Sequence, residues 1–335
     1  MLKKSRQADR RMLIILTLLL LLIGLSVFLY IYSRTYAKAI RLNLPMAPAA
    51  FDSIMSRTIP ALIGMGAAAV LIATVSLSFQ TITQSRILTP SMIGFDSVFM
   101  GTQTVLVFLF GSASSVFSNP YLNYAIVAGV MVIISMLMYG MILRRNKNNL
   151  VFLLMFGLIL GGIVRSGSTY LQVIMDTNEY NQVRAATSVT VNNMNTNIVY
   201  LTVPLMFIVN LAMLYRHKIY DVLSLGPDNA KSLGVPYEKE VNINLFLISI
   251  GMSIATALIG SLAFLGLLAV NIARELFGTH KHLPLFLGSA ALAVLALVLG
   301  QALVELLQGA VPVTVIIDLA GCSYMFYLIL KENRI

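Results

Sequence analysis

Long apolar runs separated by short polar breaks recur along this 335-residue chain. A helix needs about 20 apolar residues to cross the hydrocarbon core of a membrane. Ten runs approach that length, at residues 12–32, 59–79, 91–110, 122–143, 150–173, 197–215, 241–259, 262–276, 283–307 and 313–330. The pattern predicts an all-α, polytopic membrane protein with about ten transmembrane helices, in one transmembrane domain that covers residues 1–335.

Three of these runs need comment. The run 12–32 follows a basic tail, as a signal peptide does, but it is too long and lacks a small-residue cleavage site, so we interpret it as a retained span. The runs 91–110 and 262–276 are short or contain polar residues and glycines. Such runs are typical of helices buried among other helices.

The composition excludes the soluble classes. Only 11% of the residues are charged and 58% are hydrophobic, whereas soluble domains carry about 25% charged residues. A soluble enzyme and a disordered chain are therefore both excluded. Cys322 is the single cysteine, which rules out an internal disulfide and a cysteine-rich metal cluster.

The basic residues are distributed unequally between the two sets of loops. An even number of spans places both ends on one side, and 17 of the 23 Lys and Arg residues lie on that side. Basic loops stay in the cytoplasm, so both termini and residues 216–240 are predicted to be cytoplasmic, in a multi-pass protein of the cell membrane. Orientation explains the net charge of +10, and no basic stripe with interleaved aromatic residues indicates nucleic-acid binding.

The cytoplasmic segment 216–240 contains signals for a short helix. Gly226, Pro227 and Asp228 form a helix start, because proline is tolerated in the first turn and an acidic residue favours the positive helix end. A helix over 229–233 would then end at Gly234, with Pro236 preventing its continuation. An ordinary surface loop could carry the same capping pattern.

Residues 225–235, Leu-Gly-Pro-Asp-Asn-Ala-Lys-Ser-Leu-Gly-Val, resemble the coupling segment of the FecCD-type permeases, the membrane subunits of ABC importers for iron–siderophores, haem and cobalamin. Residues 56–67, 88–96, 260–267 with 272–274, and the last span with Pro312 and Gly321 carry the same resemblance in the family's order. The resemblance implies a permease fold in which a pair of short cytoplasmic helices docks into a separate ATPase subunit.

The implied coupling residues all lie in one stretch of the chain. They are Gly226, Pro227, Asp228, Asn229, Ala230, Lys231, Leu233 and Gly234. No G-x-x-x-x-G-K-[ST] phosphate loop is present, so ATP and Mg²⁺ are expected on the partner ATPase and no cofactor on this chain. The resemblance further implies two ATPase subunits, a second permease chain and an extracytoplasmic substrate-binding lipoprotein or periplasmic protein.

Two departures from the family pattern bear on the substrate. Val270-Asn271 replace the usual Pro-His, and Gly321-Cys322-Ser323 replace the usual Gly-Ala-Pro. The Val-Asn variant and the Thr-Pro-Ser-x-x-Gly-Phe-Asp turn at residues 89–96 resemble the branch that imports ferric catecholate-type siderophores such as petrobactin. Two different permease chains often pair in that branch, so the second permease is expected to be a different homologue or an identical copy.

Site residues outside the coupling segment are predicted on weaker signals. Arg57 matches a position that pairs with glutamates of the binding protein, although an arginine there could also extend to the lipid headgroups. Gly162, Ser166 and Ser168 fit a wide, weakly polar pathway, or else close helix packing. Asp318 is an ionisable residue inside a span, and such residues are functional candidates.

The other classes of function receive less support. An ion-coupled secondary transporter is the alternative, but such proteins normally carry more ionisable residues within their spans. The sequence has neither H-E-x-x-H nor G-x-S-x-G, so an intramembrane protease is not indicated. His280 and His282 could form a weak metal pair, although a solvated loop is the preferred interpretation and no metal site is predicted.

Overall fold

The computed structural model describes residues 2–37, 48–111, 114, 116, 119–145, 150–189 and 194–332, and within these ranges it is helical with no strand. Its elements are α1 (Leu2–Tyr32), the π-helical η1 (Ser33–Ala37), α3 (Pro48–Ile82), the 3₁₀-helical η2 (Pro90–Ile93), α4 (Phe95–Phe110), α6 (Pro120–Arg145), α7 (Leu150–Ile174), α8 (Thr177–Thr187), α9 (Thr196–Tyr215), α10 (His217–Leu223), α11 (Pro227–Ser232), α12 (Tyr237–Ile259), α13 (Leu265–Phe277), α14 (His282–Leu306) and α15 (Val313–Glu332).

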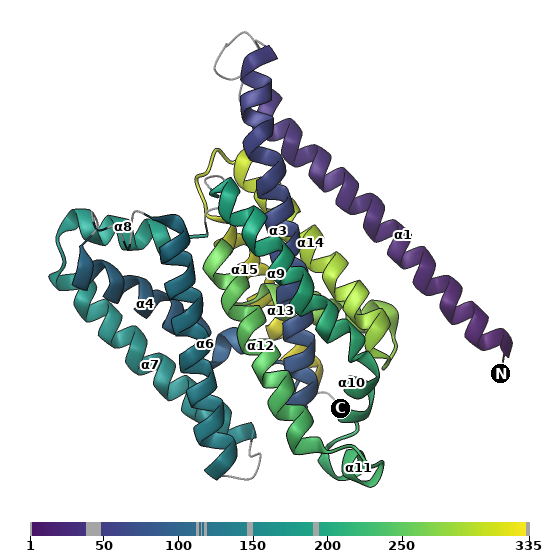
Figure 1. Cartoon of the computed structure of the whole chain (residues 1–335). Coiled ribbons are helices and arrows are strands. Elements are labelled where there is room, and N and C mark those ends of the chain that lie inside the picture. The colour runs from purple at the N-terminus through teal and green to yellow at the C-terminus, as the bar shows by residue number, and fades with distance from the viewer. Residues whose placement is uncertain are drawn as a thin grey trace.

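Helix α3 lies at the centre of the bundle and packs against α9, α12, α13 and α14 (Figure 1). Many of its buried residues are small, among them Ala69, Ala73, Ser76 and Ser78. Small side chains let neighbouring helix backbones approach closely. The close approach is visible at Gly266 of α13, where an added Cβ would lie 2.6 Å from the Cβ of Ser76.

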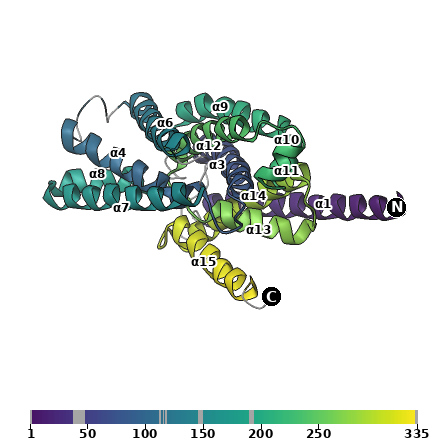
Figure 2. The same cartoon turned by 90° about the horizontal axis from the view of Figure 1, so that it is seen from below.

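The remaining helices surround this centre. Helices α4, α6, α7 and α8 pack together on one flank, α1 runs along α14, and α15 packs against α13 and α14 (Figures 1 and 2). The short helices α10 and α11 lie together at one end of the bundle, and the start of α1 and the end of α15 lie toward that same end (Figure 1).

Many large apolar side chains are exposed on the long helices. Large exposed side chains include Leu21 on α1, Val173 on α7 and Phe207 on α9. Among the described residues, six helices are long and apolar enough to cross a membrane, namely α1, α3, α6, α9, α12 and α14. Exposed apolar area of this extent is compatible with lipid contact rather than with water.

The apolar runs 91–110 and 262–276 contain shorter helices than their lengths suggest. Helix α4 has 16 residues and follows Gly94, whose φ is +104°, while α13 has 13 residues and follows a non-helical stretch that begins at Gly260, whose φ is +88°. At 1.5 Å per residue α13 is about 20 Å long, against a hydrocarbon core of about 30 Å. In each segment, backbone with a positive-φ glycine precedes the helix.

Three loop predictions differ from the structure. Helix α3 begins at Pro48 rather than at Ile59, where the apolar run starts, and α12 begins at Tyr237 rather than at Val241. Helix α8 lies in the polar interruption 174–196, where no helix was expected. In each case the additional helical residues include polar ones, so a search for apolar runs does not detect them.

Candidate functional site

The segment 216–240, which the sequence predicts to be cytoplasmic, contains a short helix, α11, over Pro227–Ser232. Gly226 precedes it with a φ of +90°, a conformation that favours glycine. Pro227 and Asp228 occupy the first turn, where a missing N–H costs nothing and a negative charge is favourable. The predicted helix is confirmed, although it starts two residues earlier than expected.

The end of α11 is a Schellman motif. The backbone N–H of Gly234 donates to the carbonyl of Lys231 (3.0 Å), and that of Val235 donates to the carbonyl of Ala230 (3.1 Å). Gly234 has a φ of +83°, which this motif requires after the last helical residue. Gly234 therefore stops the helix, as predicted from the sequence.

Helix α11 presents a mixed surface to solvent. The side chains of Asp228, Asn229 and Lys231 are exposed, while Ala230 is fully buried beneath the helix. Two leucines flank the helix and are also exposed, Leu225 at 52% and Leu233 at 63%. A rigid polar helix bordered by exposed leucines is a surface suited to another protein.

Helix α10, directly before α11, is the second short helix of the segment and is anchored to the bundle. An ion pair joins Arg216, at its start, to Glu240 of α12. The hydroxyl of Tyr220 donates to Oδ1 of Asn244 on α12 (2.7 Å). Burial raises the pKa of Tyr220 to about 12, so the phenol stays protonated and remains a donor.

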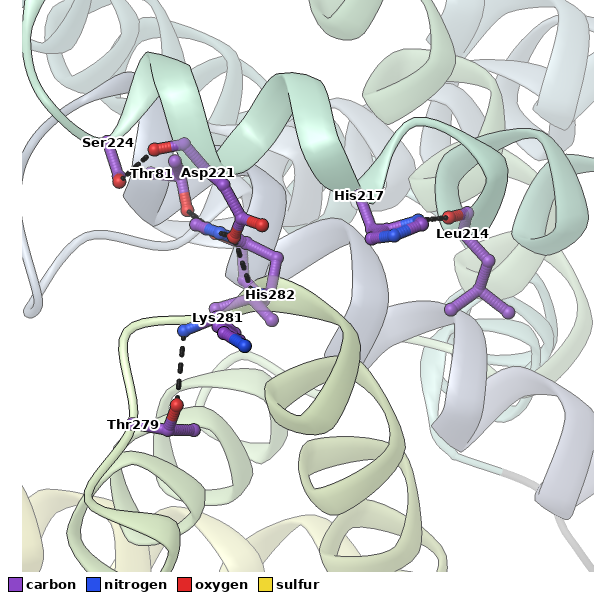
Figure 3. A network of polar contacts seen from close by, with 9 residues as sticks. Thr81, Leu214, His217, Asp221, Ser224, Thr279, Lys281 and His282 are labelled. Atoms are coloured by element: carbon purple, nitrogen blue, oxygen red, sulfur yellow. Dashed lines mark hydrogen bonds and ion pairs between the residues drawn. The ribbon is translucent and has the colours of Figure 1, made fainter. Parts of the chain in front are cut away.

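A second set of contacts joins α10 to α3 and α14 (Figure 3). Oδ1 of Asp221 on α10 accepts from the backbone N–H of His282 (2.7 Å) and lies 2.7 Å from its ring Nδ1. The other ring nitrogen, Nε2, lies 2.8 Å from Oγ1 of Thr81 on α3. His282 thus contacts α10 through Asp221 and the central helix α3 through Thr81.

This arrangement corrects one prediction. His282 was expected in a solvated loop, but it is the first residue of α14 and its side chain is 3% exposed. His280 is exposed. The two residues therefore differ in environment, and both ring nitrogens of His282 are already occupied by Asp221 and Thr81, so they do not form a metal pair.

The loop after α3 supplies a further contact with α10. Nε2 of Gln84 donates to the carbonyl of Leu223 at the end of α10 (3.0 Å) and to the carbonyl of Thr81 (2.9 Å). Nearby, Nδ2 of Asn271 donates to the carbonyl of Arg86 (2.9 Å), so the asparagine that replaces the family's histidine fixes α13 to the same loop. A cavity of about 680 Å³ is lined by this loop, by residues 224–225 and by parts of α3, α13, α14 and α15.

The structure places Arg57 inside α3 rather than before it, with an exposed side chain. Because α3 begins at Pro48, Arg57 is held on a regular helix nine residues from its start. A side chain on a helix has a defined direction, which suits an orienting contact better than a loop would. Its role in docking a binding protein stays a prediction.

The candidate pathway residues of α7 separate into two groups. Gly162 and Ser166 are exposed, and a Cβ at Gly162 would have no atom within 4 Å. Ser168 is 3% exposed and donates its hydroxyl to the carbonyl of Val164. Gly161 lies against the Gly94 turn, where an added Cβ would lie 3.0 Å from that glycine's Cα. The small residues thus serve close packing at Gly161, while Gly162 and Ser166 stay open.

Asp318 lies near charged residues that are distant in sequence. Asp318 and Arg165 of α7 both interact electrostatically with Asp96 at the start of α4. One carboxylate oxygen of Asp318 and one of Asp96 are buried with no hydrogen-bond partner among the described residues. Asp96 was not identified as a site residue from the sequence, because only the fold brings α4, α7 and α15 together there.

The sequence profile of the FecCD transport family matches residues 13–331. Petrobactin import system permease protein YclO of Bacillus subtilis is 40% identical over 260 residues, which are 77% of this chain and 82% of the relative. Petrobactin import system permease protein FatC of Bacillus anthracis is 30% identical over 334 residues, which are 99% of this chain and 92% of the relative.

A more distant relative and a solved structure agree with these matches. Ferric enterobactin transport system permease protein FepD of Escherichia coli is 27% identical over 334 residues, covering 96% of this chain and 94% of the relative. An inward-facing structure of a metal-chelate type ABC transporter superposes with a TM-score of 0.77 over 96% of this chain and 99% of that one, at 18% identity. The solved structure supports the fold.

Proposed function

The chain belongs to the FecCD transport family, and on that premise we propose that it is the permease subunit of an ABC importer that carries an iron(III)–siderophore across the cytoplasmic membrane. The cargo class we propose is a ferric catecholate-type siderophore such as petrobactin, since two relatives are named as petrobactin import permeases. The chain performs no covalent chemistry, because it provides a pathway and a mechanical contact.

The observation that carries this proposal is the coupling segment. Helix α11 is short, capped at both ends by glycines with positive φ, and exposed at one end of the bundle. Three residues separate it from α10, which contacts α3, α12 and α14. Movement of an ATPase bound to α11 would therefore be passed through α10 to α3, α12 and α14, which we propose cross the membrane.

The proposed assembly contains two permease chains, two ATPase subunits and an extracytoplasmic binding protein. ATP and Mg²⁺ are bound by the ATPases. The proposed topology has ten spans with both termini and α11 in the cytoplasm, which the excess of basic residues on that side supports. In this orientation Arg57 faces outward, where it would pair with an acidic residue of the binding protein.

The cargo is large, so the pathway must be wide. We place it beside the exposed part of α7 that contains Gly162 and Ser166, because neither residue is used to pack helices within this chain. The second permease would supply the opposite wall. Asp318 lies on α15 and is a further candidate for this wall, since its carboxylate is only partly satisfied.

Uptake of ⁵⁵Fe-labelled petrobactin tests the function. The permease would be expressed with its genomic partner permease, ATPase and binding protein in a strain that lacks petrobactin uptake. We expect uptake that disappears when the ATPase carries an inactive phosphate loop. Uptake that persists with the inactive ATPase and depends on an ion gradient would instead support a secondary transporter.

A second experiment tests the coupling residues. Replacing Asp228 and Asn229 by tryptophan changes the exposed face of α11 without touching the buried Ala230. We expect this variant to insert normally but to lose both ATPase capture and uptake. Lys239→Trp, at an exposed position on α12, is the matched control. Normal uptake by the α11 variant would exclude the coupling role.

A further inference from the structure

We propose that His282 is a positioning residue that joins the coupling segment to the membrane helices, by fixing α10 to α14 and α3 at once. The proposal rests on the function proposed above, because it identifies where the movement of α10 and α11 is transmitted. Three contacts carry it: Asp221 to the backbone N–H of His282, Asp221 to its Nδ1, and Thr81 to its Nε2.

The position of Asp221 is explained by α14 rather than by its own helix. Asp221 lies in the C-terminal half of α10, where a negative charge is unfavourable for that helix. It lies instead at the N-terminus of α14, where free N–H groups and the helix dipole favour a carboxylate. Lys281, at the N-cap position of α14, provides no side-chain cap. A residue of the coupling segment therefore caps a membrane helix.

The imidazole ring is held in one orientation by its neighbours. The ring of Tyr220 is stacked 5.8 Å from it, and the ring of Phe286 lies 6.1 Å away. Both of these side chains are fully or almost fully buried. Because rotation of the ring would break the contacts of both nitrogens, the histidine acts as a rigid connection rather than as an adaptable one.

The contact with Thr81 extends the connection to the central helix. The hydroxyl of Thr81 lies 2.8 Å from the carbonyl of Leu77 as well as 2.8 Å from Nε2 of His282. Thr81 is in the last turn of α3, and Gln84 beyond it donates to the end of α10. The end of α3, the start of α14 and α10 thus form one polar cluster, which we call the Asp221–His282–Thr81 cluster.

This cluster predicts a specific defect. Without it, α10 and α11 could still bind the ATPase, because the exposed face of α11 is unchanged. The movement of α10 would no longer be passed fully to α3 and α14. Hydrolysis of ATP would then continue while transport fell, so the amount of ATP consumed per siderophore transported would rise.

The test uses the full complex in proteoliposomes, with ATPase capture, ATP hydrolysis and ⁵⁵Fe-siderophore transport measured on the same preparation. His282→Asn keeps an amide group near the position of Nδ1, His282→Gln keeps one near the position of Nε2, and His282→Leu keeps neither. We expect His282→Leu to raise the ratio of hydrolysis to transport about tenfold, as for loss of a charged hydrogen bond. The Asn and Gln variants should lie between it and the wild type.

Two comparisons keep the outcome decisive. His280→Leu, at the neighbouring exposed position, should leave the ratio unchanged. Asp221→Ala should raise the ratio, and the Asp221→Ala, His282→Leu double variant should be no worse than His282→Leu alone, because the two residues act through one another. The side chain of Asp221 is 36% exposed, so water can fill the space left by Asp221→Ala. This variant therefore tests the contact even if His282→Leu disturbs folding.

The proposal is overturned if hydrolysis and transport fall in the same proportion in these variants, or if the two single effects add. A wild-type complex that captures no ATPase would instead contradict the proposed function itself. The two failures are therefore distinguished by the capture step.

Discussion

Substitution of Gly234 changes the backbone geometry at the end of α11 without changing the exposed side chains of that helix. Gly234 has a φ of +83°, and a Cβ added there would have no atom within 4 Å. A side chain at this position therefore costs only backbone strain and no steric overlap. The series Gly234→Asn, Gly234→Ala and Gly234→Val increases that strain in steps, because asparagine tolerates the left-handed region and β-branched residues do not.

The size of the effect follows from the conformation. The left-handed region costs an L-residue about 1–2 kcal/mol. An exposed helix at the tip of the molecule can relieve this strain by leaving the Schellman geometry, and docking must then restore it. A cost of that size corresponds to a loss of about 5- to 30-fold in ATPase affinity for the alanine variant. The asparagine variant should lose less and the valine variant more.

Affinity of the detergent-purified permease for its ATPase, measured by titration at fixed nucleotide and salt, is the assay. Gly309 is the matched control, since it also has a positive φ (+72°) and no atom within 4 Å of an added Cβ, but lies between α14 and α15. Gly309→Val should leave the affinity unchanged. The reasoning is refuted if Gly234→Val binds as tightly as the wild type, or if the three Gly234 variants do not follow the expected order.

Three further predictions concern other parts of the chain. Gly266→Ala should lower the melting temperature of the purified protein, because the new Cβ overlaps α3 at a cost of about 1–3 kcal/mol. Gly129→Ala on α6, with open space around its Cβ, should leave the melting temperature unchanged or raise it. Thermal size-exclusion chromatography measures both, and equal shifts would contradict this packing. Arg57→Glu should weaken the affinity of the binding protein for the permease several-fold at low salt, because an exposed ion pair contributes about 0–1 kcal/mol. Arg184→Glu on α8 should leave this affinity unchanged. Equal affinities of the two variants in a binding titration would contradict the docking role of Arg57. Tyr220→Phe leaves the buried Oδ1 of Asn244 on α12 without its donor and should destabilise the protein by about 1–3 kcal/mol. An unchanged melting temperature would show that water replaces the hydroxyl.

The elements with strong local signals were predictable. The apolar runs predicted the long helices α3, α9, α12 and α14, because a helix that is buried or in contact with lipid over about 20 residues requires a continuous run of apolar residues. Helix α11 was predictable from glycine and proline at its two ends, since these residues act on the backbone itself. The family match followed from the same segment and was confirmed by the comparisons.

The contacts that anchor α10 to α14 and α3 were not predictable from one sequence. Asp221 and His282 are 61 residues apart, and Thr81 and His282 are 201 residues apart. Nothing near His282 distinguishes a buried first residue of a helix from a solvated loop. The proximity of Asp96 to Asp318 was hidden for the same reason, because it arises from the packing of three helices rather than from spacing along the chain.

The short helices α4 and α13 have a consequence for how the chain is made. A nascent segment enters the bilayer alone only when its own helix satisfies its backbone across the whole hydrocarbon width. Segments that contain Gly94 or Gly260 cannot do so, since each leaves part of its backbone outside a helix. We therefore expect their integration to wait for neighbouring helices synthesised before or after them, so that the chain assembles in the bilayer in pairs or groups of helices rather than span by span.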